Sequence, residues 1–181
     1  MSSTIKIVSP TSLITFFVPI IALIGAVLSK NFVFLDYVHV ITGGTWTGID
    51  LFMGVIMSRI MRSLEPQVRA EIIKRLVPLM LFFMPSLASV ATTAGVYIGM
   101  DLGIFSISNR LILIAGIIVL ILLIQGFGIF LPNEVRIYLE LRKENPDVKK
   151  IIKLGMRNIY LSGSQVVFQI AIIFIMAMLT V

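Results

Sequence analysis

The chain has 181 residues, of which 58% are hydrophobic and 13% charged, and it contains no cysteine. This composition excludes an ordinary soluble domain and is typical of a helical membrane protein. The absence of cysteine excludes disulfides, thiolate metal sites, iron–sulfur clusters and covalent c-type haem attachment.

Five apolar segments are each long enough to cross about 30 Å of hydrocarbon. They lie at residues 11–29, 36–61, 76–100, 110–132 and 158–181. We therefore predict an all-α polytopic bundle of five transmembrane helices. Little chain remains outside these spans, so residues 1–181 are predicted to form one integral membrane domain.

The net charge of +6 reflects 15 basic and 9 acidic residues. Except for Lys30 and Arg110, every basic residue lies near the N-terminus or within 59–75 and 134–157. The positive-inside rule then places the N-terminus in the cytoplasm and the C-terminus on the exoplasmic side of a cell (plasma) membrane. The basic loops are expected to contact anionic lipid heads of the bilayer, and no nucleic-acid binding is expected.

The first span has no ionisable residue and is expected at the periphery of the bundle. In the second span, seven residues recur at intervals of three or four, so they fall on one face of the helix. This face is called the stripe. The stripe consists of His39, Gly43, Trp46, Asp50, Met53, Met57 and Met61. It holds the chain's only histidine and only tryptophan.

Asp50 lies near the middle of the second span, where an ionisable group is costly unless it faces protein or water. The polar residues expected at the same depth in the membrane are Ser89 and Thr92 in the third span and Gln169 in the fifth. We predict contact with at least one of them. Two roles remain open for Asp50: a catalytic, proton-handling carboxyl, or a structural hydrogen-bonding group.

His39 lies near the outer boundary, beside glycines that remove side chains from its surroundings. One interpretation is a binding site for a flat ligand, haem b or a quinone, in a pocket formed by the outer ends of spans 2, 3 and 4. The candidate cofactor-binding residues are then His39, Gly43, Trp46 and Tyr97. The alternative is that the glycines serve helix packing and His39 only bonds to a carbonyl.

Methionines also recur one helical turn apart, at Met53, Met57 and Met61 and at Met80 and Met84. Thioethers at this spacing suit copper(I), so His39, Met53 and Met57 are candidate metal ligands. Methionine is equally a common filler of gaps in apolar cores.

The two basic loops resemble each other. Residues 65–74 and 145–153 share a proline, a valine, a basic position and an Ile-Ile-Lys end. Spans 2–3 and 4–5 are therefore predicted to be tandem copies of one hairpin, related by a pseudo-two-fold axis along the membrane normal. Only the first copy carries the stripe.

The segment from Tyr37 and His39 through Gly43 and Gly44 to residues 46–48 resembles the superfamily that includes the CopD copper-resistance proteins and HemJ-type protoporphyrinogen oxidases. In that superfamily, an early span opens with a similar histidine, followed about two turns later by an aromatic residue and a glycine. The resemblance covers spans 2–3 and implies that His39 contacts haem or a metal.

Three functions follow from these observations. The first is a membrane redox or cofactor-binding protein, with a haem-type or quinone ligand near His39 and proton handling by Asp50. The second is a transporter of copper or a small solute that uses Asp50 and the methionine pairs. The third is a non-catalytic membrane subunit of a respiratory or transport complex. A homo-oligomer or a larger membrane complex is expected in each case, and the sequence leaves open whether the protein is an enzyme.

Overall fold

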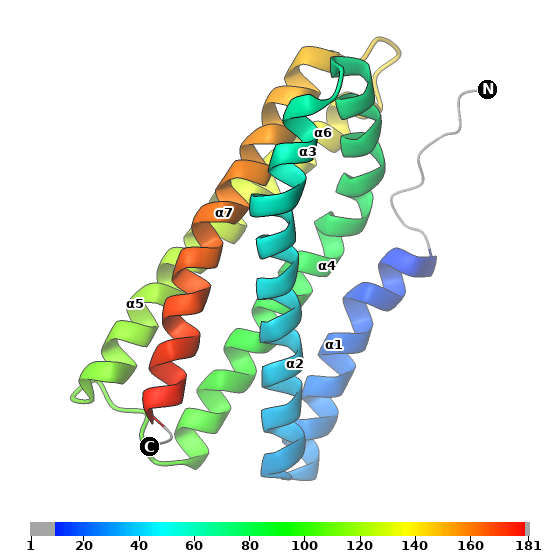
Figure 1. The fold of residues 1–181 in the computed structure, drawn as a ribbon. Coiled ribbons are helices and arrows are strands. Elements are labelled where there is room, and N and C mark those ends of the chain that lie inside the picture. The colour runs from blue at the N-terminus through cyan, green and yellow to red at the C-terminus, as the bar shows by residue number, and fades with distance from the viewer. Residues whose placement is uncertain (1–9, 180–181) are drawn as a thin grey trace.

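The computed structural model describes residues 10–179, and within this range it is helical, with no strand. Five of its helical segments are long and apolar enough to cross a membrane (Figure 1). The prediction of an all-α protein with five candidate membrane spans is confirmed.

Two of the spans contain a π-helical turn, so the structure has more helical elements than spans. The first span is α1 (Pro10–Ser29); the second comprises α2 (Phe32–Leu51), η1 (Phe52–Met57) and α3 (Ser58–Ser63). The third span is α4 (Pro66–Asp101). The fourth comprises α5 (Arg110–Gln125), η2 (Gly126–Phe130) and α6 (Leu131–Leu141), and the fifth is α7 (Val148–Leu179).

The helices extend further than the apolar segments at the end of the bundle that holds the connections 64–65 and 142–147. This end, at the top of Figure 1, is called the basic end, and the opposite end, with connections 30–31 and 102–109, the far end. At the basic end, α4 begins at Pro66 and α7 at Val148, about ten residues before the predicted spans. Ile73 and Ile151 are buried there, so the segments from Pro66 and from Val148 belong to the same helices as the spans that follow them.

The π-helical segment η2 has a local cause in the sequence. It runs from Gly126 to Phe130, two residues before Pro132, which has no backbone N–H and whose ring collides with the carbonyl four residues earlier in a regular α-helix. A widened turn relieves that conflict, and π-turns of this kind are frequent at functional sites.

α1 lies at one side of the bundle and packs against α2 and α4 (Figure 1). The Ser86 hydroxyl of α4 donates a hydrogen bond to the Phe16 carbonyl of α1 (2.7 Å). α7 contacts α2, η1, α4, α5 and α6, so the fifth span packs against each of spans 2, 3 and 4.

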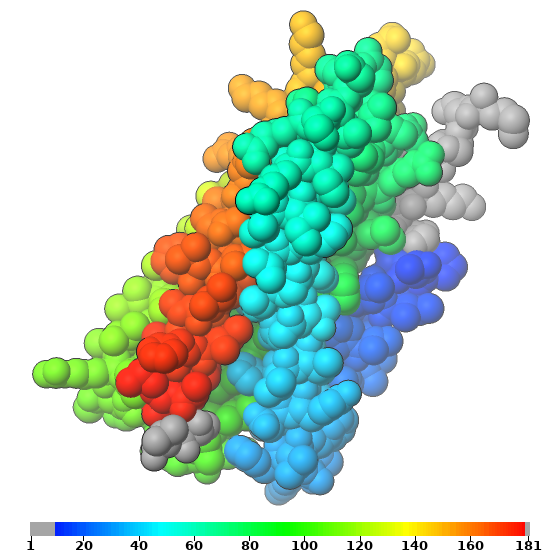
Figure 2. Space-filling view, in the orientation of Figure 1, coloured from blue at the N-terminus to red at the C-terminus, as the bar shows by residue number. Residues whose placement is uncertain are grey.

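The backbones of η1 and α7 approach closely at Gly54 and Gly163. A Cβ built on Gly54 would overlap the backbone N and Cα of Gly163 and lie 3.0 Å from the carbonyl carbon of Ser162. Figure 2 shows the side chains of the second span (cyan) and of α7 (orange) meeting in the upper half of the view. This contact fixes α7 against the helix that carries the stripe.

Candidate functional site

The stripe of the second span faces the interior of the protein. Trp46, Asp50, Met53 and Met61 are buried, and His39, Gly43 and Met57 are partly buried. From Met53 onward the stripe residues recur at intervals of four, and the wider turn of η1 keeps Met53 and Met57 on the inner side.

Asp50 makes a hydrogen bond across the bundle. The Gln169 side-chain amide of α7 donates to Oδ2 of Asp50 at 2.9 Å, and both residues are almost completely buried. The predicted contact with one of three polar partners is therefore present, through Gln169. Ser89 is exposed and Thr92 is partly buried. The other carboxyl oxygen of Asp50, Oδ1, is buried without a hydrogen-bond partner.

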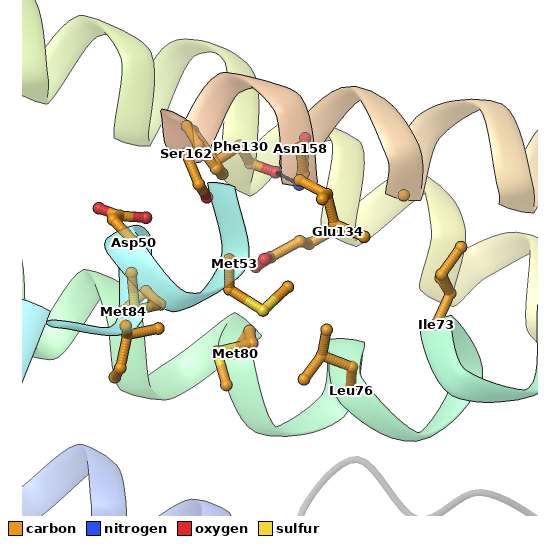
Figure 3. Close-up of a pocket in the computed structure, with 13 residues that line it drawn as sticks. Asp50, Met53, Ile73, Leu76, Met80, Met84, Phe130, Glu134, Asn158 and Ser162 are labelled. Atoms are coloured by element: carbon orange, nitrogen blue, oxygen red, sulfur yellow. Dashed lines mark hydrogen bonds between the residues drawn. The ribbon is translucent and has the colours of Figure 1, made fainter. Parts of the chain in front are cut away.

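The Asp50 carboxyl lines a small cavity of about 40 Å³, called here the small cavity. That volume is enough for at least one water molecule. α4, α6 and α7 complete the walls, with Met53, Met80 and Met84, the polar side chains Asn158 and Ser162, and a second carboxyl, Glu134. Figure 3 shows Glu134 extending from α6 toward the turn that carries Asp50 and Met53.

Glu134 is 7% exposed, and no hydrogen bond or ion pair to its carboxyl occurs within residues 10–179. Sequence reasoning missed it, because the predicted fourth span ended at residue 132 and Glu134 was assigned to the loop. The buried residues of α6 are Asn133, Glu134, Ile137 and Glu140, a helical spacing that could have indicated an inward face.

Neighbouring polar contacts hold this part of α6 in place. Asn133 donates its side-chain amide to Oδ1 of Asn158 at 2.8 Å, and Asn158 donates to the Phe130 carbonyl at 3.3 Å. The acceptor of the second bond is a backbone carbonyl of η2, where the regular i to i−4 hydrogen bonds of an α-helix are interrupted. The fixed α6–α7 contact therefore sets the position of Glu134.

A second, larger cavity of about 590 Å³, called the large cavity, occupies the far-end half of the bundle. It lies between α2, α4, α5 and α7, and its wall is predominantly apolar. His39, Gly43 and Trp46 line it, and so does Gln169. Val40 and Ile173, also in the wall, are 60% and 51% exposed, so the cavity is open at the outer surfaces of α2 and α7.

His39 is oriented by α4. Its Nδ1 lies 2.8 Å from the Ala91 carbonyl, and since a carbonyl only accepts, Nδ1 carries the proton in this contact. In the neutral ring, Nε2 then has a free lone pair, which can accept a hydrogen bond or bind a metal. The ring lies against Gly95, where a Cβ would come within 2.8 Å of Cε1. Gly95 thus provides the space for the imidazole.

Gln169 connects the two cavities. Its side chain lines the large cavity and donates to Asp50, which lines the small one. The structure therefore arranges His39, Gln169, Asp50 and Glu134 in order from the far end toward the basic end.

The remaining predicted site residues lie elsewhere. Tyr97 is 41% exposed and does not line the large cavity, although its neighbours Val96 and Ile98 do. Met57 packs against the apolar cluster around Met53 and Met61 and lines neither cavity. His39 and Met53 line different cavities, so the structure does not bring the predicted metal ligands together.

Within residues 10–179, no group of three or more histidine, aspartate or glutamate side chains is placed to hold a metal ion. Comparison of the chain with protein-family models, curated proteins and solved structures gives no match. The resemblance to the CopD and HemJ-type superfamily therefore stays a prediction.

Proposed function

We propose that the protein binds a flat, lipid-soluble ligand of the quinone or haem type in the large cavity, with His39 as its polar contact and Asp50 as a proton-handling group. The observation that carries this proposal is the position of His39, whose Nδ1 is held by Ala91 while its ring borders an apolar space of about 590 Å³. Cavities of this size and character are typical of sites for small organic ligands and cofactors.

The chain's residues fit such a ligand in three respects. Gly43 and Gly44 leave room for a ring close to the backbone of α2, and a Cβ at Gly44 would meet nothing within 4 Å. Trp46 offers an aromatic surface in the same wall. Exposed apolar residues at the opening allow entry from the lipid. A ligand of this class would supply electron transfer, while His39 orients it and the Gln169–Asp50 pair lies beside it to exchange a proton.

Spectroscopy and extraction of the purified full-length protein test this proposal. A Soret band would identify haem, and chromatography of an organic extract would identify a quinone; a short-chain ubiquinone analogue serves as a titration probe. His39→Ala should lose the ligand or weaken its binding at least tenfold, whereas Ile41→Ala, on the exposed face of α2, should bind as the unmodified protein does. Equal binding by His39→Ala would overturn the proposal.

Copper transport is the second candidate, and a specific observation favours it. Met53, Met80 and Met84 come from two spans and line the small cavity together with Asp50. Thioether sulfurs are the ligands that copper(I) prefers. Competition against a copper(I) chelator would measure this affinity, and Met80→Leu should abolish it.

We further infer that the basic end faces the cytoplasm of a plasma membrane and that the α2–α4 and α5–α7 hairpins are tandem copies. Each hairpin opens with a span that contains a π-helical segment and continues through a basic connection to an uninterrupted helix. The segments differ in their distance from the shared proline: η1 ends nine residues before Pro66, and η2 ends 16 residues before Pro146. The tandem-copy proposal therefore requires an insertion of seven residues between η2 and Pro146 in the second copy.

A further inference from the structure

We propose that Asp50 and Glu134 form a two-carboxyl proton relay through the small cavity, connecting the large cavity with the basic end of the bundle. The inference deepens the proposed function, since it assigns the route of the proton that Asp50 handles. It adds a residue, Glu134, and a direction of transfer.

The first support is that neither buried carboxyl is fully hydrogen-bonded: Asp50 accepts from Gln169 through one oxygen only, and no hydrogen bond or ion pair to Glu134 occurs within residues 10–179. Oδ1 of Asp50 has no hydrogen-bond partner, and Asp50 is 1% exposed. Glu134 is 7% exposed and lies on another span. A buried ionisable group in a membrane span is costly and marks a pathway for ions or protons more often than a structural contact.

The second support is that the two carboxyls share one space. Both line the small cavity, whose volume of about 40 Å³ holds at least one water molecule. Asn158 and Ser162 also face it and can hydrogen-bond to that water. Among the described residues that line the cavity, Asp50 and Glu134 are the ionisable ones, so no fixed positive charge neutralises either of them there.

The third support is the polar groups that flank the pair on its two sides. Toward the far end, Asp50 accepts from Gln169, which borders the large cavity. Toward the basic end, α6 leads from Glu134 to Glu140, about 9 Å further along the helix. Glu140 accepts from Lys143 and Lys150 (Nζ–O distances of 2.9 Å and 2.7 Å), and these lysines are exposed to solvent.

The transfer step needs water as its one additional reactant. With one proton on the pair, the protonated carboxyl of Asp50 gives its proton to a water in the small cavity as that water gives one to the carboxylate of Glu134. The O–H bond of Asp50 breaks, the water gains one O–H bond and loses another, and a new O–H bond forms on Glu134. The water is regenerated, and the negative charge moves from Glu134 to Asp50. Two charged carboxylates facing one cavity would repel each other, which favours the singly protonated pair.

Proton flux into vesicles tests the relay without the unidentified ligand. The purified full chain is reconstituted in phosphatidylcholine vesicles that contain a pH-sensitive dye, and a potassium gradient with valinomycin drives proton entry. We expect a flux above that of protein-free vesicles. Glu134→Gln and Asp50→Asn should each reduce it at least tenfold, and the double variant should reduce it no further, because both residues lie on one path.

Two variants serve as controls. Glu71→Gln removes an exposed carboxylate that pairs with Arg75 on the surface of α4 and should leave the flux unchanged. Glu134→Asp keeps the carboxyl and should restore part of the flux. Should Glu134→Gln fail to fold, treatment of the unmodified protein with dicyclohexylcarbodiimide, a reagent for buried protonated carboxyls, should label Asp50 or Glu134 and block the flux.

The relay and the proposed ligand site fail in distinguishable ways. Glu134 lies outside the large cavity, so Glu134→Gln should bind a quinone or haem-type ligand as the unmodified protein does. A flux that is the same in Glu134→Gln and Glu71→Gln, or no flux above that of empty vesicles, would overturn the relay and leave the ligand proposal standing.

Discussion

Gly54→Ala should destabilise the protein, because the added methyl group meets backbone and not a movable side chain. Its Cβ would overlap the N and Cα of Gly163 and lie 3.0 Å from the Ser162 carbonyl carbon. Overpacking of this kind costs about 1–3 kcal/mol. Gly48→Ala is the matched control in the same span, since its Cβ would meet nothing within 4 Å. It should stabilise the helix by about 0.5–1 kcal/mol, so the two variants should differ by about 1.5–4 kcal/mol.

The free energy of unfolding can be measured by titrating the purified protein from mild detergent into sodium dodecyl sulfate and following helix content. Gly163→Ala provides an internal comparison, because its Cβ would lie 3.7 Å from Gly54 Cα, an ordinary van der Waals distance. It should be close to neutral although it belongs to the same contact. Equal stabilities of Gly54→Ala and Gly48→Ala would refute the close approach of η1 and α7.

Three further predictions concern the two cavities and the topology. Asp50→Leu should lower the free energy of unfolding by about 1–3 kcal/mol, because it leaves the buried Gln169 amide without an acceptor, whereas Asp50→Asn keeps an acceptor oxygen and should be nearly neutral in the same titration. Gly95→Ala should displace the His39 ring, and the loss in binding free energy should be at least as large as the loss in free energy of unfolding. A binding titration and a thermal melt of the same variant would measure the two, and unchanged binding would argue against His39 as a ligand contact. Reporter fusions after residues 33, 67, 105 and 145 should alternate between the two sides of the membrane, and two consecutive fusions on the same side would contradict the five-span topology.

The spans and the inward face of the second span could be predicted because apolar length and helical spacing are local properties of the sequence. The Asp50–Gln169 contact could be predicted as well, since depth in a membrane restricts a buried aspartate to a few partners. The pocket beside His39 was predicted to be formed by spans 2, 3 and 4, and the structure adds a fourth wall from α7, which includes Gln169 and Ile173. That addition depends on which helices are neighbours, which a single sequence does not specify.

Glu134 and the grouping of Met53 with Met80 and Met84 could not be predicted in the same way. Pro132 looks like the end of a span, but the widened turn of η2 lets the helix continue and brings Glu134 inside. Methionine pairs one turn apart on one helix indicated Met57 as the partner of Met53. The small cavity is instead lined by methionines from two helices, and their relative register depends on how the second span packs against α4.

The glycine contact between η1 and α7 also has a mechanical consequence. It lies beside the small cavity, whereas α7 extends from Gly163 to Leu179, about 24 Å farther toward the far end. A hinge at the Gly54–Gly163 contact would let the far ends of α2 and α7 move apart to admit a bulky molecule, while Asp50 and Glu134 hardly move. Entry of a ligand at the far end would then leave the spacing of the two proton-carrying groups unchanged.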